Sequence, residues 1–133
     1  MTYAELGAAD ITARTHASTD LSASRHKLAT MASTQRVDVT GAVATNDATG
    51  VFQDNHDAAH PGDAAQVRIF GVTKVIAGDV IACGALLAPS GTVAGRVLTA
   101  TTGDRSIGRA LEAATVAGQV IAAIITPFGH KAL

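Results

Sequence analysis

The stretch VIAGDVIACGALLAP, from Val75 to Pro89, has a close echo in TVAGQVIAAIITP, from Thr115 to Pro127. Both contain Ala-Gly, a polar residue, Val-Ile-Ala and a further apolar run. Ala-Gly followed by a polar residue marks a turn, and the Val and Ile residues around it favour β-strands. The echo therefore predicts two turn-and-strand units in one sheet system. It does not predict a solenoid, which needs a longer series of repeats.

The segments around this pair are also rich in β-prone residues. VRIFGVTKVIA, from Val67, is a long run in which Val67, Ile69 and Val75 share one parity. Further strands are predicted in ITARTHAS from Ile11, HKLATMA from His26, RVDVT from Arg36, VIACGALLA from Val80, RVLTA from Arg96 and QVIAAIITPF from Gln119. Strands separated by Gly-containing turns at this density predict an all-β fold, either a small β-barrel or a β-sandwich.

Two details of this prediction stay open. A short helix near Ala110–Ala114 is possible, because Ala, Leu and Glu favour helix. The first ten residues carry no clear pattern, and Tyr3 and Leu6 are their large apolar side chains. We therefore expect residues 1–10 to form an extended arm and residues 11–133 to form one β-rich domain.

Composition narrows the classes of function. The net charge is −1 and no basic run occurs, so an electrostatic nucleic-acid binder is not expected. No apolar run is long enough to span a membrane, and the opening segment lacks the features of a secretory signal. Ala is the commonest residue and only 3 % of residues are aromatic. Because such a core has little bulk per residue, we expect an oligomer or a partner to add buried surface.

Candidate chemical motifs give no catalytic prediction. The single Cys83 excludes an internal disulfide and a Cys-based zinc site, and its apolar surroundings predict a small buried hydrophobe. HDAAH, from His56 to His60, imitates a zinc-protease motif, but Pro61 disfavours the helix that this motif requires. Asp104 and Arg105 are expected to form a surface pair. No phosphate-binding loop or nucleophile elbow occurs, so we expect no enzyme activity, metal or cofactor.

Several segments follow one another in a recognisable order. They are Gly50-Val51-Phe52-Gln53, Gly62-Asp63, Val67 to Val75, Ala77-Gly78, Gly95 to Leu98, Gly103-Asp104 to Ala114, and Ala117 to Ile125. In order and spacing these segments resemble the capsid cement, or head decoration, proteins of tailed bacteriophages. Ile11 to Ser18 and Arg25 to Ala32 resemble the first two strands of that family more loosely.

The resemblance implies a structural virion protein on the outer surface of a phage capsid. Its expected partners are the major capsid protein, whose subunit joints it would cement, and further copies of itself in a homotrimer. Contacts to the capsid are predicted at Tyr3, Leu6 and Ile11. Packing between subunits or between sheets is predicted at Val80, Ala82, Leu86, Val120, Ala122 and Ile124. The alternative is a small β-barrel module that binds a ligand or a protein.

Overall fold

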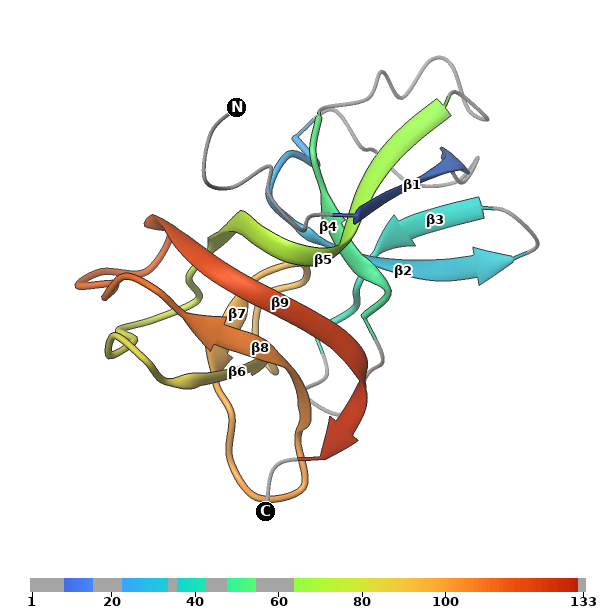
Figure 1. The fold of residues 1–133 in the computed structure, drawn as a ribbon. Helices are drawn as coiled ribbons and strands as arrows, with labels where there is room; N and C mark the ends of the chain where they lie inside the picture. The colour runs from blue at the N-terminus through green and yellow to red at the C-terminus, as the bar shows by residue number, and fades with distance from the viewer. Residues whose placement is uncertain (1–8, 16–22, 34–35, 43–47, 55–63, 132–133) are drawn as a thin grey trace.

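The computed structural model describes residues 9–15, 23–33, 36–42, 48–54 and 64–131, and these residues form strands, turns and loops (Figure 1). The nine strands are β1 (Ala9–Thr15), β2 (Leu28–Ser33), β3 (Arg36–Val39), β4 (Gly50–Phe52), β5 (Ala64–Ile76), β6 (Leu86–Pro89), β7 (Val97–Thr99), β8 (Arg105–Ala110) and β9 (Val120–Lys131). The predicted all-β class is confirmed, and its form is that of small curled barrels.

The long strand β5 belongs to two curled sheets. Its first half pairs with β4 and β1, and β1 continues through β3 and β2 back to β4, so this sheet closes on itself. Its second half pairs with β9. Phe70 is paired with β1, whereas the next residue, Gly71, is paired with Ile125 of β9. Gly71 has a φ of 103°, which favours glycine, so the strand can change direction at this point.

The second sheet runs in the order β5-β9-β8-β6-β7 and also curls back to β5. Ala77, just after β5, forms a parallel bridge with Val97 of β7, and the Gly78 N–H donates to the Val97 carbonyl at 2.7 Å. A closed sheet leaves few unpaired edge strands, which protects a β protein from edge-to-edge aggregation. The chain is therefore two small barrels that share β5 (Figure 1).

A second link between the barrels comes from the loop between β6 and β7. Gly95 of this loop donates its N–H to the Thr40 carbonyl at 2.9 Å and accepts from the Leu28 N–H at 2.9 Å. A Cβ at Gly95 would come within 2.7 Å of a methyl group of Val39. Only glycine, which has no side chain, permits this close approach. Through its two hydrogen bonds, Gly95 joins the second barrel to the ends of β2 and β3.

The two Ala-Gly turns of the sequence echo lie side by side. The Ala77 N–H donates to the Gln119 carbonyl at 2.8 Å, and the Gly118 N–H donates to the Ala77 carbonyl at 2.7 Å. The first turn ends β5 and the second precedes β9. The two predicted turns are therefore confirmed within one sheet system, but only the second turn leads directly into a strand.

The strand predicted from Val80 begins only at Leu86. Val80–Ala85 forms a loop instead of a strand. Its backbone pairs with the segment after β8 at an isolated bridge, where Ile81 and Ala114 exchange hydrogen bonds of 2.9 and 2.8 Å. The same pairing excludes the short helix that the sequence left possible near Ala110–Ala114. Helix propensity is overridden here by tertiary hydrogen bonds.

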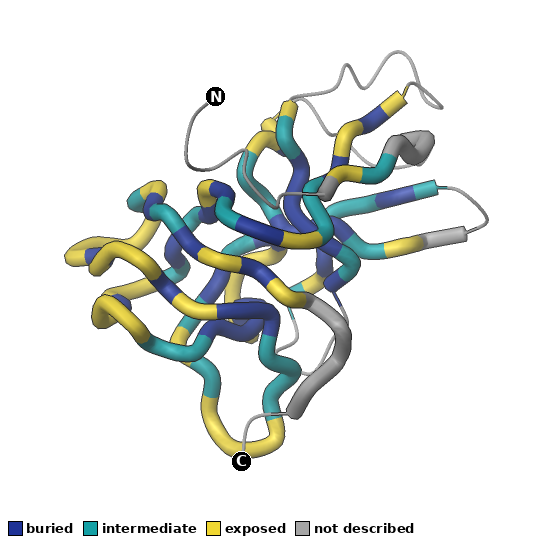
Figure 2. Tube along the Cα trace, in the orientation of Figure 1, coloured by how far each residue is buried: buried dark blue, intermediate teal, exposed yellow. Residues whose placement is uncertain are grey.

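The alternation of buried and exposed side chains along β5 confirms the predicted parity of this strand. Val67 and Val75 are fully buried, whereas Phe70 and Lys74 are exposed. Figure 2 shows the same alternation along β9. The first barrel is filled by Ala29, Val37, Phe52, Ala65 and Val67. The second is filled mainly by Leu28, Val51, Val75, Ala77, Ile81, Leu87, Val97, Ile107, Ala110, Ala114, Ile121, Ala123 and Ile125.

The short strand β4 was not expected from the sequence, and its first residue provides a test of the packing. A Cβ on Gly50 would lie 2.2 Å from the carbonyl oxygen of Arg68, a backbone atom that cannot move aside without distorting β5. We expect Gly50→Ala to lower the free energy of unfolding by about 2 kcal/mol or more. Gly91→Ala is the control, because no atom lies within 4 Å of a Cβ at Gly91. Urea unfolding of both variants measures the difference, and equal stabilities would contradict the close β4–β5 packing.

Candidate functional site

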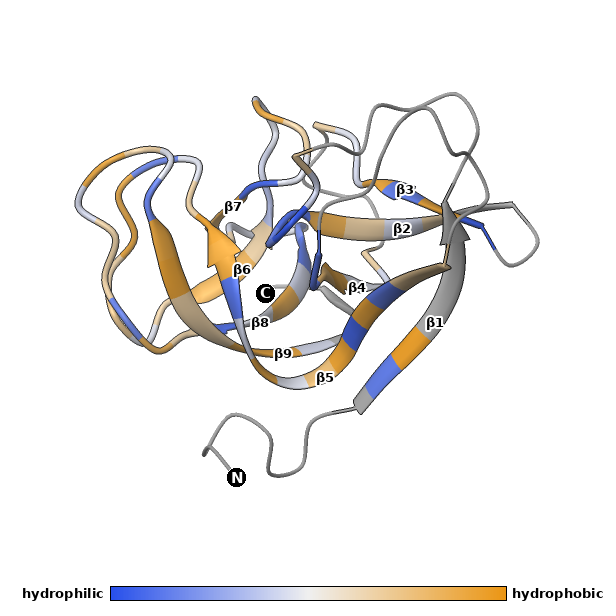
Figure 3. Ribbon diagram, turned by 90° about the horizontal axis from the view of Figure 1, so that it is seen from above, coloured by the Kyte–Doolittle hydropathy of each residue, from blue (hydrophilic) through white to orange (hydrophobic). Residues whose placement is uncertain are grey.

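One face of the second sheet carries exposed apolar side chains. On β9, Val120 is 43 % exposed and Ile124 is 39 % exposed, whereas the intervening Ile121 is buried. The register places Ile76 opposite Val120 and Val72 opposite Ile124. We call this surface the β9 face, and its members are Val72, Lys74, Ile76, Arg109, Leu111, Val120, Ala122 and Ile124. Figure 3 colours much of β9 and β6 as hydrophobic, while polar residues interrupt β5.

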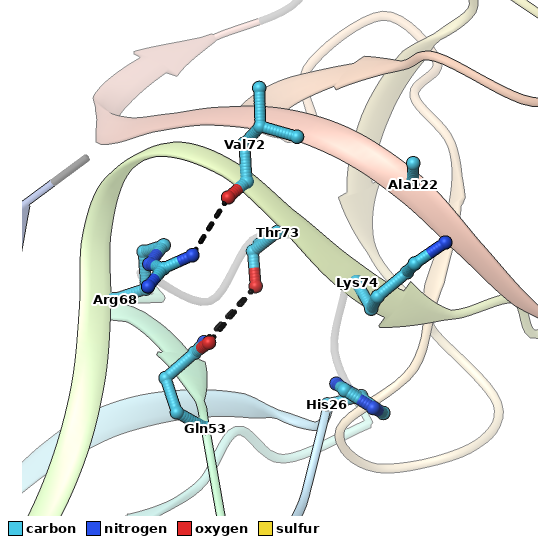
Figure 4. Close-up of a pocket in the computed structure, with 7 residues that line it drawn as sticks. All are labelled: His26, Gln53, Arg68, Val72, Thr73, Lys74 and Ala122. Carbon is cyan, nitrogen blue, oxygen red and sulfur yellow. Dashed lines mark hydrogen bonds between the residues drawn. The ribbon is translucent and has the colours of Figure 1, made fainter. Parts of the chain in front are cut away.

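A small cavity opens beside this face, near the point where β5 changes sheet (Figure 4). Its volume is about 150 Å³, and it is lined by His26, Gln53, Arg68, Val72, Thr73, Lys74 and Ala122. The buried Thr73 hydroxyl accepts a hydrogen bond from Gln53 Nε2 at 3.0 Å. Pockets for drug-sized ligands hold roughly 300–1,000 Å³. This cavity is therefore of a size for one side chain or a small ion.

Arg68 braces the wall of the cavity. Its Nη1 donates to the Val72 carbonyl at 3.0 Å, and its Nε donates to Asp10 Oδ1 at 2.8 Å. Arg68 and Val72 lie on opposite sides of Gly71, so the guanidinium spans the bend of β5. The ion pair with Asp10 also joins β1 to β5. Because both groups are partly shielded from water, this pair fixes the orientation of the side chain more than a fully exposed pair would.

The other cationic groups of the cavity are less firmly held. Lys74 Nζ lies 3.6 Å from Glu112 Oε1, and both side chains are about half exposed, so this ion pair contributes little stability. His26 Nδ1 is buried and has no hydrogen-bond partner among the described residues. Burial lowers the pKa of His26, and the positive charges of Arg25 and Lys74 lower it further. Arg68 and Lys74 thus bring two cations to the cavity, each with one carboxylate beside it, and the buried His26 Nδ1 is left without a described partner.

A second exposed apolar surface lies at the end of the second barrel. Val80 is 64 % exposed and Val116 is 61 % exposed, in the loops that follow β5 and precede β9. Asp79 is exposed beside Val80, and its Oδ1 accepts a hydrogen bond from the Val80 N–H at 2.8 Å. We call Asp79, Val80 and Val116 the loop end.

The six predicted packing residues all lie at the surface side of their elements. Val80, Ala82, Val120 and Ile124 are exposed, and Leu86 and Ala122 are half-buried. Their buried sequence neighbours Ile81, Leu87, Ile121, Ala123 and Ile125 fill the core instead. None of these six residues is fully buried within one chain. Packing between subunits stays a prediction.

Of the predicted capsid contacts, Ile11 is half-buried and packs against the core of the first barrel. Tyr3 and Leu6 lie outside the described residues. The predicted arm included Asp10, but Ala9 and Asp10 are the first residues of β1. The remainder of the arm lies outside the described part.

Of the other sequence motifs, the structure describes Cys83 and Asp104. Cys83 is exposed, so the prediction of a buried thiol is wrong: it lies in the Val80–Ala85 loop, where its Sγ contacts the Leu111 carbonyl at 3.4 Å. Asp104 accepts hydrogen bonds from the N–H and hydroxyl of Thr101 at 2.8 and 3.0 Å, which closes the turn before β8. His56 and His60 lie outside the described residues.

No group of three or more His, Cys, Asp and Glu side chains lies close enough to hold a metal ion in the part of the chain that the structure describes. Across the same residues, no helix has the length and hydropathy to cross a membrane.

The lowered pKa of His26 predicts a pH dependence of stability. Because the folded-state pKa lies below the ordinary value of 6.5, the unfolded chain binds more protons once the pH falls below 6.5. The free energy of unfolding should therefore decrease as the pH is lowered from 6.5 toward the folded-state pKa. His26→Asn removes this titration and tolerates the φ of 68° at this position.

Urea unfolding of both proteins between about pH 7.5 and 5 measures the effect. All other titratable groups are the same in both proteins, so the difference between the two curves reports His26. We expect the variant to lose less stability on acidification than the wild-type chain. Parallel curves would mean that His26 is not held neutral by its surroundings.

Comparisons with known proteins give a structural match. No family model matches the chain, and no curated protein matches it. Among solved structures, the N base of head fiber gp8.5 of bacteriophage phi29 is similar, with a TM-score of 0.64 and 20 % sequence identity. The match covers 94 % of this chain and 99 % of that chain. The chain thus has the fold of a phage head fiber base along nearly its whole length.

Proposed function

We propose that this chain is a structural protein of a phage head, that it binds the outer surface of the capsid, and that it cements joints between major capsid protein subunits. One structural likeness and one expectation from the sequence support a head protein. The fold is shared with the N base of a phage head fiber. The segments between Gly50 and Ile125 resemble capsid decoration proteins in order and spacing.

The exposed apolar surface of the second barrel is the observation that carries the proposal. Val120, Ile124 and Leu111 of the β9 face are each 39–44 % exposed, and they lie on neighbouring segments of one sheet. Soluble monomers rarely expose contiguous apolar patches, and such patches commonly mark protein–protein contacts. A rigid double barrel with an apolar face suits a protein that works by binding other proteins.

Cementing needs contacts across capsid joints rather than chemistry. Packaged DNA presses outward on the shell, and each added contact across a joint opposes the separation of capsid subunits. Many copies on one particle turn a modest contact into strong attachment, because linked sites bind with avidity. We further propose that the chain forms a homotrimer, since closed cyclic symmetry is the usual arrangement of such oligomers.

The rival hypothesis of a ligand-binding barrel has less support. The cavity beside the β9 face holds about 150 Å³. This volume is below the range of pockets that enclose drug-sized ligands. The apolar β9 face fits a protein partner better than it fits a small molecule.

Thermal release of DNA tests the cementing role. Particles that lack this protein should release their DNA at a lower temperature than complete particles, because contacts across the joints are missing. Adding the purified chain back should restore the release temperature and should make the chain sediment with the capsids. Dye accessibility of the DNA during heating measures the transition. Equal release temperatures with and without bound protein would contradict cementing, even if the protein sedimented with the shell.

A single substitution tests whether attachment depends on the β9 face as a contact between copies, whose linked sites would bind the capsid with avidity. Ile124→Glu places a charge on an exposed apolar position, so the fold should persist while burial against a partner becomes costly. We expect attachment to capsids to weaken about tenfold or more. Thr99→Glu is the control, because Thr99 is exposed on β7 and lies outside the β9 face. If both variants co-sediment with capsids like the wild-type chain, attachment does not depend on the β9 face.

A further inference from the structure

The loop end and the β9 face complement each other in charge and in apolar character. We propose that the loop end of one copy docks on the β9 face of a second copy, with the Asp79 carboxylate at the cavity lined by His26, Arg68 and Lys74. This inference rests on the self-association contained in the proposed function, and it assigns the surfaces that make the contact.

The cavity side of the contact carries two cations, of which Lys74 is only weakly paired, and one buried nitrogen, His26 Nδ1, without a described partner. The weak Lys74–Glu112 ion pair of 3.6 Å is half exposed, so an incoming carboxylate can compete for the ammonium. His26 Nδ1 is buried without a described partner and can donate a hydrogen bond when protonated there. Arg68 is already held by Asp10 and Val72, and it adds positive charge to the wall without moving. Such a site favours a carboxylate on the approaching surface.

Asp79 stands out among the described carboxylates. Asp10 pairs with Arg68, Asp104 closes the Thr101 turn, and Glu112 already lies at Lys74. Asp38 accepts from the Val39 N–H, and Asp38 and Asp54 both have further interactions. Asp79 is exposed, and its described contact is the hydrogen bond from the adjacent Val80 N–H to Oδ1. No described residue donates to its second oxygen, so that oxygen can accept from a partner.

The apolar groups around each charge also match. Asp79 is adjacent to Val80, and the loop end includes Val116, so the carboxylate projects beside the two most exposed large hydrophobic residues described. On the other surface, Val120 and Ile124 flank Ala122, which lines the cavity. Docking would bury the apolar side chains of both surfaces. Because these side chains exclude water from the contact, the attraction between the Asp79 carboxylate and the cations would be screened less.

The contact joins two different surfaces of the same chain, so it is heterologous. A heterologous contact generates a ring when the rotation closes and an open filament when it does not. The proposed homotrimer is a closed ring of this kind. A second copy is therefore the occupant, because one chain supplies both complementary surfaces.

A charge swap on the full-length chain tests the contact. Lys74→Asp and Asp79→Lys should each weaken self-association about tenfold or more in sedimentation velocity, because each places like charges together. The double variant restores opposite charges and should recover most of the wild-type association. Both positions are exposed, so the variants should fold, and thermal melts check this. Arg105→Asp is the control, because Arg105 lies outside both surfaces. Its backbone is in register with Lys131 at the far end of β9.

The His26 imidazole gives an independent readout. Arg25, Lys74 and Arg68 surround it with positive charge, Gln53 and Thr73 complete the cavity wall, and Asp10 is engaged by Arg68. Arrival of the Asp79 carboxylate should raise the His26 pKa in the assembled state relative to the dilute monomer. In Asp79→Asn the side-chain carbonyl can still accept from the Val80 N–H, but this rise should disappear. NMR titration of the histidine ring signals measures it.

Several results would overturn the inference. They are a wild-type chain that stays monomeric at its highest soluble concentration, single charge variants that assemble normally, a double variant that does not recover, or a His26 pKa that is the same in both states. Failure of the proposed function is distinguishable from these results. A chain that forms rings but neither binds capsids nor retains DNA would remove the cementing role alone, and a monomer that cements capsids would remove this contact alone.

Discussion

The bend of β5 at Gly71 is the constraint on which the rest of the structure depends. A single strand can serve two curled sheets only if its hydrogen-bonding direction changes partway along, and Gly71 supplies that change with a φ of 103°. Arg68 spans the bend through its hydrogen bond to Val72 and holds β1 through Asp10. Closure of both barrels follows from this junction, since β1 and β4 use one half of the strand and β9 uses the other.

Closure of the sheets decides which surfaces are left for binding. With most strands paired on both sides, the chain offers partners the outer faces of its strands and the loops at the barrel ends. The β9 face keeps apolar side chains outward because β9 is apolar at both parities, with Ile121 inside and Ile124 outside. The cavity lies beside the bend because His26, Gln53 and Arg68 of the first barrel meet Thr73 and Lys74 of the second. The junction between the barrels thus creates the cavity beside the β9 face.

Local patterns in the sequence were enough for much of the fold. The alternation from Val67 to Val75 and the β-branched run after Gln119 predicted strands that the structure contains, and the density of turns predicted the all-β class. The apolar character of β9 at both parities also indicated a surface that a partner could cover. Failures occurred where backbone pairing opposed local preference. The loop at Val80–Ala85, the lost helix near Ala110–Ala114 and the exposed Cys83 all follow from the bridge between Ile81 and Ala114.

The sequence by itself determined the β class, the parity of the long strands and the two Ala-Gly turns, because these depend on residues close together in the chain. Only the tertiary structure decided that the turns pair with each other, that β5 is shared, and that His26, Arg68 and Lys74 line one cavity. These features join residues far apart in the chain, and no local period encodes such contacts. The direction of Val120 and Ile124 toward solvent was likewise decided by the register with β5, which a strand apolar on both faces leaves undetermined.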